Sequence, residues 1–238
     1  MNLLITICAR GGSKGIPGKN IKELDGKPVL AYTISVAQKF SRKFETDIEL
    51  STDSEDIIRI AKNYGLETEY RRPKELASDT AGKVTAIEDL LRYKEAKENK
   101  KYDIILDLDV TSPLRTVEDL TNALKKLQQK SNALNIFSVS PAERNPYFNM
   151  VEELEDGFVQ LVKKGKEIKS RQKAPEVYDM NASFYFFKRN YFEQNYSITV
   201  TDRSLGYVVP HICFDIDKPL DFKFMDFLLR ENLMDFEI

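Results

Sequence analysis

Apolar residues along the first 140 positions follow two alternating spacings. Strands are expected at 3–8, 47–52, 66–71, 103–108 and 134–139, where apolar residues either follow one another or alternate with polar ones. Between them, apolar residues recur at helical spacing in 28–40, 54–64, 85–99 and 116–129. Ser54 and Thr116 are the expected N-caps of two of these helices. The alternation predicts an α/β fold with a mostly parallel, twisted sheet that helices cover on both faces.

The pattern changes after residue 140. Residues 158–162 and 166–168 are expected to form short antiparallel strands around 164–165, with another turn at 155–157. Because such a hairpin buries little alone, we expect 141–175 to be an inserted arm that packs on a second subunit of a homodimer. The alternative is a flap folded on its own domain. Residues 1–140 and 176–238 are assigned to the α/β domain, with strands at 181–187, 207–209 and 212–216 and a final helix at 219–229.

Residues 9–20, which follow the first strand, are rich in glycine and cations. Ligands of parallel sheets bind at the carboxyl ends of the strands. Glycines let the backbone bring N–H groups close to an anion, and Arg10, Lys14 and Lys19 add positive charge. This favours a phosphate-binding loop over a solvated turn. The loop matches neither the Walker pattern nor the dinucleotide fingerprint, which argues against an ordinary ATPase and a dehydrogenase.

Two pairs of carboxylates alternate along later strand-like runs. Asp215 and Asp217, before the final helix, would project to one side and suit a magnesium ion, although they could equally cap that helix. Asp107 and Asp109 form the other pair, and Asp109 is the better site candidate because it is nearer the strand end. The single histidine, His211, argues against a histidine-rich metal site and a Ser-His-Asp triad.

Length and charge narrow the function classes. The 238 residues suit one domain, or one domain with a small appendage. A net charge of −2 argues against non-specific nucleic-acid binding. No apolar run approaches the roughly 20 residues that span a bilayer, so no membrane partner is expected. Cys8 and Cys213 lie in apolar runs and are expected to be core thiols, which indicates a cytoplasmic protein. No signal peptide is expected, because no basic residue precedes the first apolar run.

Taken together, these stretches resemble the CMP-sialic acid (nonulosonate) synthetase family over nearly the whole chain. The matching stretches fall in family order at 9–15, 19–20, 51–54, 72–73, 76–80, 111–115 and 214–217. The variants at 7–9, 106–109, 145–149 and 178–183 look most like the bacterial CMP-legionaminic acid synthetases. The sialic acid enzymes usually have Gln-Pro where this chain has Asp109-Val110, and in them that glutamine faces the sugar. The difference argues against N-acetylneuraminate itself as the substrate.

The resemblance implies a nucleotide-diphospho-sugar transferase-like, Rossmann-like fold. It also implies a cytidylyltransferase that joins CTP to a nine-carbon 2-keto acid sugar, with Mg²⁺ held by Asp215 and Asp217. The catalytic candidates are Arg10, Lys14, Asp109, Asp215 and Asp217. The nucleotide-binding candidates are Ala9, Arg10, Gly11, Gly12, Ser13, Lys14, Lys19, Asn20, Arg72 and Lys83, the last where the family usually has serine. The sugar-binding candidates are Asp109, Thr111, Ser112, Arg171, Tyr185 and Phe187, with Arg171 assigned to the sugar carboxylate.

Two points stay open at this stage. The general base could be Asp109, Asp217 or a water molecule. The alternative functions are a nucleotidyltransferase of the same fold that uses another sugar or nucleotide, and a nucleotide-binding protein without turnover.

Overall fold

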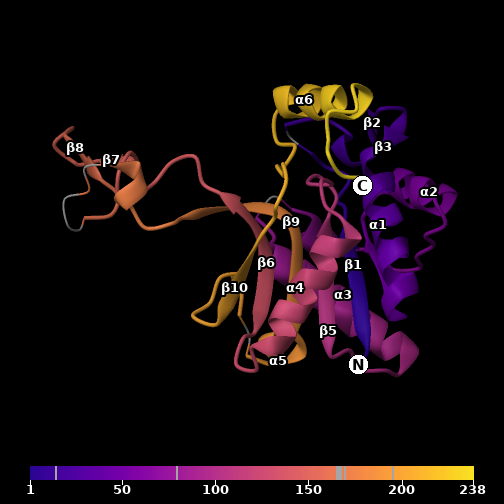
Figure 1. The fold of residues 1–238 in the computed structure, drawn as a ribbon. Coiled ribbons are helices and arrows are strands. Elements are labelled where there is room, and N and C mark those ends of the chain that lie inside the picture. Colours follow the sequence, from indigo (N-terminus) through magenta and orange to yellow (C-terminus); the bar gives the residue numbers. More distant parts are fainter. Residues whose placement is uncertain (14, 79, 165–167, 169, 195) are drawn as a thin grey trace.

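The computed structural model places six strands in one central sheet (Figure 1). It describes the whole chain except residues 14, 79, 165–167, 169 and 195. The strands run in the order β10 (Ser204–Val208), β6 (Asn135–Pro141), β9 (Tyr178–Lys188), β5 (Ile104–Asp109), β1 (Leu3–Cys8) and β4 (Asp47–Ser51). Strand β9 is antiparallel to β5 and β6, and the other neighbours pair in parallel. The prediction of a mostly parallel sheet is therefore confirmed, with one antiparallel strand inserted in its middle.

Helices cover both faces of this sheet. The alternate residues Leu3, Ile5 and Ile7 of β1 pack in one core with α1 (Val29–Phe44), α2 (Glu55–Asn63), α4 (Val117–Gln129) and α6 (Pro219–Arg230). Leu4 points to the opposite core, which α3 (Lys83–Glu98) and α5 (Arg189–Glu193) cover. Successive strand residues point to opposite faces, so the near-continuous apolar run of β1 supplies both cores.

Local capping signals begin several helices where the sequence places them. The Ser54 side chain accepts a hydrogen bond from the Ile57 amide and begins α2. Thr116 and Asp119 form a reciprocal capping box at the start of α4, as predicted. Among the described residues, every helix is too short or too polar to cross a bilayer.

Two expected strands are absent from the described sheet. Residues 66–71 form no strand. The Thr68 hydroxyl donates to the Leu50 carbonyl and accepts from the Tyr70 amide, so the side chain engages two backbone groups that a ladder could use. Residues 212–216 also form no strand. The loop after β5 holds that segment instead, since the Ile216 amide donates to the Thr111 carbonyl. Both strand predictions were wrong.

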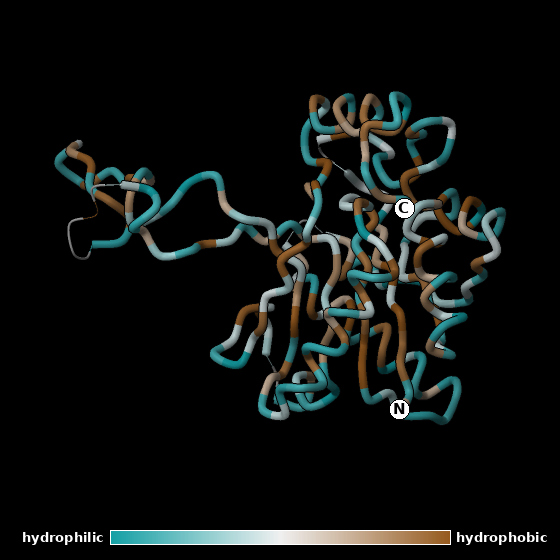
Figure 2. Tube along the Cα trace, in the orientation of Figure 1, coloured by the Kyte–Doolittle hydropathy of each residue, from teal (hydrophilic) through white to brown (hydrophobic). Residues whose placement is uncertain are grey.

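Residues 142–177 extend away from the sheet as an arm (Figure 1). The arm carries a small hairpin of β7 (Val151–Glu153) and β8 (Val159–Leu161), closed at Gly157 in the left-handed conformation. The expected strand at 158–162 therefore forms, but its partner is β7, and most of the partner expected at 166–168 lies outside the described residues. Figure 2 shows hydrophobic residues concentrated along the central strands, with a few at the hairpin. The division into domains stays a prediction.

Candidate functional site

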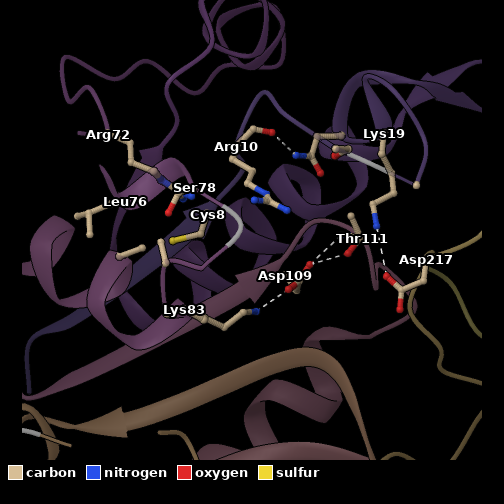
Figure 3. Close-up of a pocket in the computed structure, with 16 residues that line it drawn as sticks. Cys8, Arg10, Lys19, Arg72, Leu76, Ser78, Lys83, Asp109, Thr111 and Asp217 are labelled. Carbon is tan, nitrogen blue, oxygen red and sulfur yellow. Dashed lines mark hydrogen bonds and ion pairs between the residues drawn. The ribbon is translucent and has the colours of Figure 1, made fainter. Parts of the chain in front are cut away.

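A cavity of about 380 Å³ opens where β1 and β5 end (Figure 3). Cys8, the last residue of β1, pairs with Asp109 of β5 and with Ser51 of β4. The carboxyl-terminal ends of these three strands are therefore aligned at one edge of the sheet. Of the residues that the sequence singles out, nine line this cavity: Arg10, Ser13, Lys19, Asn20, Arg72, Lys83, Asp109, Thr111 and Asp217. They come from both ends of the chain and from its middle. Lys14 lies outside the described residues.

The glycine-rich loop wraps around one side of the cavity. The Asn20 side chain donates to the Arg10 carbonyl at 2.9 Å, which fixes the loop's return. The Gly11 amide donates to the Asp53 carboxylate at 2.8 Å, so this N–H group is engaged within the protein and does not face a ligand phosphate. A Cβ atom at Gly15 would lie 2.6 Å from the Asp217 carbonyl oxygen. Glycine is therefore required there for the loop to approach the carboxyl-terminal segment.

Three nucleotide-binding candidates of the same loop do not line the cavity. Ala9 is fully buried behind it, and its amide donates to the Ser51 carbonyl. Gly11 lines a smaller adjoining cavity of about 140 Å³. Gly12 has open space around its Cα position.

Lys19 connects the loop to the segment before α6. Its ammonium donates to the Ile216 carbonyl and lies 3.6 Å from the Asp217 carboxylate. The Lys19 side chain is 13% exposed, whereas that of Asp217 is 72% exposed. Lys19 is thus held in position by protein groups, while the Asp217 carboxylate remains open to a ligand.

Lys83 and Asp109 form an ion pair on the opposite side of the cavity. The Lys83 Nζ atom lies 2.5 Å from Asp109 Oδ2 and 3.4 Å from Asp107 Oδ2. Asp107 and Asp109 point to the same face of β5, toward α3, as their alternation predicted. The Thr111 amide and hydroxyl each donate to Asp109 Oδ1 at 2.9 Å.

The two carboxyls of β5 have opposite pKa shifts. Burial alone would raise the pKa of Asp109, but the Lys83 ammonium and the Thr111 donors hold it below its usual range. Burial dominates at Asp107 and raises its pKa, because Lys83 is farther away and Asp107 Oδ2 has no hydrogen-bond partner. The attraction of both carboxylates outweighs burial at Lys83 and raises the pKa of its ammonium. Asp109 is therefore the charged partner of Lys83.

Asp215 and Asp217 differ in their surroundings, and their projection to one side stays a prediction. Asp217 lines the cavity, whereas Asp215 Oδ1 is buried without a hydrogen-bond partner. Burial raises the pKa of Asp215, and the negative charge of Asp109 raises it further. Within the described residues, no group of three or more acidic, histidine or cysteine side chains converges to hold a metal ion. The magnesium site stays a prediction.

The sugar-binding candidates are dispersed. Thr111 lines the cavity, and the ring of Tyr185 lies 4.5 Å from the Lys83 ammonium. Ser112 is fully buried, where its hydroxyl donates to the Asn181 and Phe214 carbonyls. Phe187 is buried in the core under α3. Arg171 lies on the arm and donates to the Ala142 carbonyl, so the structure brings neither it nor Ser112 nor Phe187 to the cavity wall.

Arg115 is a positioning residue that the sequence argument did not single out. Its guanidinium is fully buried and donates to Asp109 O, Thr33 Oγ1, Ser112 O and Ser183 O. It thereby holds the loop after β5 against α1 and β9. The available signal was its place at the end of the 111–115 stretch, which matches the family.

Arg72 is anchored to the end of β4. Its guanidinium donates to the Ser51 hydroxyl at 2.8 Å and to the Ser51 carbonyl at 3.0 Å. This places a largely buried positive charge at the cavity wall opposite Lys19 and Asp217 (Figure 3).

Comparisons with known proteins agree with this geometry. The model of the cytidylyltransferase family matches residues 4–234. The chain is 42% identical to post-translational flagellin modification protein B of Campylobacter coli, over 97% of this chain and 96% of that protein. It is 39% identical to the CMP-N,N′-diacetyllegionaminic acid synthase of Campylobacter jejuni, over 95% of this chain and 94% of that one. In fold it is similar to CMP:2-keto-3-deoxy-manno-octonic acid synthetase complexed with CTP, with a TM-score of 0.68, 14% identity and coverage of 98% and 100% of the two chains.

Proposed function

The chain belongs to the cytidylyltransferase family, and on that premise we propose that it transfers the cytidylyl group of CTP to a nonulosonic acid and releases pyrophosphate. One observation carries the proposal. The cavity joins a cationic loop from the amino end of the chain to Asp217 from the carboxyl end. N,N′-diacetyllegionaminate is the first candidate sugar, because the relative from Campylobacter jejuni is named for it.

The reaction sets the charges that the cavity must hold. The anomeric hydroxyl oxygen attacks the α-phosphorus, the bond from that phosphorus to the bridging oxygen breaks, and pyrophosphate leaves with the bonding electrons. Negative charge grows on the phosphate oxygens, and preorganised cations are the groups that stabilise it. We assign Arg10 and Lys19 to this role. Lys14 is assigned with them from its place in the loop.

The hydroxyl proton needs an acceptor. A general base works best when its pKa is near the operating pH. Because Lys83 and Thr111 hold the pKa of Asp109 low, we infer that Asp109 is a binding group and not the base. A water molecule then takes the proton, or Asp217 does so if it is not bound to a metal ion.

A magnesium ion fits the carboxyl-terminal side of the cavity. The exposed Asp217 carboxylate and the buried, unpartnered oxygen of Asp215 are hard oxygen donors. Two carboxylates with triphosphate oxygens and water match the coordination that Mg²⁺ prefers. When bound there, the ion would neutralise phosphate charge.

We also infer a cytoplasmic homodimer joined through the arm. The hairpin exposes Val151, Phe158 and Val159, by 58%, 73% and 63% of their surface. Two strands alone cannot bury such residues, whereas a second subunit can. Both cysteines are free thiols, which suits a reducing compartment.

A pyrophosphate-release assay tests the proposal. CTP and Mg²⁺ are combined with N,N′-diacetyllegionaminate, pseudaminate, N-acetylneuraminate or a deaminated nonulosonate. We expect release with at least one sugar and the greatest kcat/KM with N,N′-diacetyllegionaminate. Absence of release with every sugar would refute the assigned activity, whereas release with a different preferred sugar would refute only the sugar assignment.

A further inference from the structure

The Lys83 ammonium has more hydrogen-bonding capacity than the described residues use. It has three N–H donors. One donates to Asp109, and another faces Asp107 Oδ2 at 3.4 Å. The Tyr185 ring, 4.5 Å away, covers one side of the ammonium. The Lys83 side chain is nevertheless 30% exposed and lines the cavity, so one N–H donor is left to face the cavity.

The Asp109 carboxylate has matching capacity to accept. Its two oxygens offer about four lone-pair sites. Within the described part of the chain, three are filled: two by the Thr111 amide and hydroxyl, and one by Lys83. The side chain is 18% exposed and also lines the cavity. Asp109 therefore has capacity for one further hydrogen bond, and it contacts the ammonium that has one N–H donor to spare.

Helix stability does not account for this lysine. Lys83 is the first residue of α3, where the N-terminal end of the helix carries partial positive charge. A cation there is unfavourable for the helix, and Lys83 is moreover largely withdrawn from water. The position is explained by the carboxylates that the side chain reaches across the cavity floor (Figure 3).

We propose that the Lys83–Asp109 pair binds one hydroxyl group of a sugar ring, which donates to Asp109 and accepts from Lys83. The pair is neutral overall, with a donor and an acceptor side by side. A hydroxyl oxygen can donate and accept at the same atom, so it matches this arrangement. A phosphate or carboxylate would be repelled by Asp109, and a cation would be repelled by Lys83.

The inference rests on the proposed function, which brings two sugars into the cavity. The hydroxyl belongs either to the ribose of the nucleotide or to the sugar acid. The chemistry at the pair is the same in both cases. Ligands that lack one hydroxyl distinguish the two sources.

Binding titrations with deoxy ligands test the proposal without requiring turnover. Calorimetry would compare CTP with 2′-deoxy-CTP and 3′-deoxy-CTP. A second series would compare N,N′-diacetyllegionaminate with its monodeoxy derivatives, in the presence of α,β-methylene-CTP, which cannot release pyrophosphate. Removal of the bound hydroxyl is expected to weaken binding to the wild-type protein about 10- to 100-fold, as for a hydrogen bond to charged groups.

Variants of the pair should abolish that selectivity. In Lys83→Met and in Asp109→Asn, we expect the parent and deoxy ligands to bind with affinities within about threefold of each other. The Lys83→Met/Asp109→Asn double variant removes both charges together. Lys83→Met alone leaves the Asp109 carboxylate without its cation and could prevent folding. The double variant leaves no unpaired charge, so the same titrations can be made with it instead.

Lys100, two residues beyond the last residue of α3, provides a matched control. Its ammonium lies 2.7 Å from Asp47 Oδ2 and 5.0 Å from the Tyr102 ring, which repeats the lysine, aspartate and tyrosine of the site. Lys100→Met should leave every ratio of deoxy to parent affinity unchanged.

The outcomes separate the inference from the proposed function. If the ratio of deoxy to parent affinity is the same in the wild-type protein and the double variant for every deoxy ligand, the hydroxyl assignment is overturned. This holds even if the protein releases pyrophosphate at a high rate. A ribose penalty that depends on the pair, in a protein that releases no pyrophosphate with any nonulosonate, would support the assignment while refuting the transferase activity.

Discussion

The Lys19 ammonium lies 3.6 Å from the Asp217 carboxylate, and this ion pair joins the loop after the first strand to the segment before the last helix. Lys19 also donates to the neighbouring Ile216 carbonyl. The contact brings Lys19, which we propose binds the triphosphate, and a candidate metal ligand to one wall of the cavity, although they come from opposite ends of the chain.

Replacing Lys19 with methionine should lower kcat/KM for CTP about 100-fold, because one preorganised charge is lost from the phosphate site. Pyrophosphate release at varied CTP concentration measures the effect. Lys22→Met is the control, since Lys22 lies over the Phe222 ring at 4.6 Å and does not line the cavity. Equal losses in the two variants would show that the effect is not specific to the site.

Replacing Asp215 with asparagine should have opposite effects on activity and stability. Asp215 Oδ1 is buried without a hydrogen-bond partner, and a buried charge in that setting costs folding free energy, so Asp215→Asn should leave the melting temperature unchanged or raise it. If the carboxylate holds magnesium, activity should fall about 100-fold and the Mg²⁺ concentration for half-maximal rate should rise. A magnesium titration and a thermal melt measure the two effects.

Asp221→Asn is the control for the magnesium titration and the thermal melt of Asp215→Asn. Asp221 accepts from the Lys218 amide in the capping box of α6, so this variant should lose about 1 kcal/mol of stability. Unchanged magnesium dependence in Asp215→Asn would remove that residue from the proposed metal site.

Arg115→Met should destabilise the protein by about 1–3 kcal/mol. The substitution removes the guanidinium donor from the carbonyl oxygens of Asp109, Ser112 and Ser183. The Thr33 hydroxyl still donates to Asp109 O and the Ser183 hydroxyl to Ser112 O, so the main cost falls on the Ser183 carbonyl. Urea unfolding followed by circular dichroism measures the loss. A change below about 1 kcal/mol would mean that water replaces the guanidinium and that Arg115 does not hold the loop.

Stability should depend on the protonation of His211. Burial alone would lower the pKa of His211, but the Asp119 carboxylate, 2.9 Å away, raises it above its usual value. Because the folded state binds the proton more tightly, this stabilisation is fully present below pH about 6.5 and is lost as the pH rises through the folded pKa. The melting temperature of the wild-type protein should therefore fall as the pH rises above about 6.5.

His211→Gln is the test of that dependence. Glutamine can still donate to Asp119 but does not titrate, so the variant should show a flatter melting profile over the same pH range. Parallel profiles for the two proteins would show that another group governs the dependence.

Phe158→Asp should dissociate the homodimer that we infer. Phe158 is 73% exposed at the hairpin of the arm, and a charge there could not be buried against a second subunit. Light scattering at about micromolar concentration should give a dimer mass for the wild-type protein and a monomer mass for the variant. Ile198→Asp, at a residue 65% exposed outside the arm, is the control and should remain dimeric. A monomeric wild-type protein would refute the dimer.

The elements that sequence patterns predicted well are those with local causes. Thr116 and Asp119 are three residues apart and form their capping box without help from the rest of the chain. No strand forms at 66–71, where the Thr68 side chain hydrogen-bonds the Leu50 carbonyl and the Tyr70 amide and so competes with a backbone ladder. No local pattern reveals that competition.

The candidate site divides in the same way. The glycine-rich loop, the carboxylates of β5 and the acidic pair before α6 could be identified from residue types and spacing. Their arrangement could not. Asp217 lines the cavity while one oxygen of Asp215 is buried, and the Ile216 amide between them donates to the carbonyl of Thr111 in a distant loop.

The sequence by itself determined the alternation of strands and helices, the helix starts and the positions of the charged stretches, because spacing and capping act over a few residues. Only the tertiary structure decided that β9 enters the sheet antiparallel between β5 and β6, and that Lys83 reaches Asp109. Those contacts join residues distant in the chain. They depend on which faces the sheet and helices bury against each other, which is a property of the whole fold.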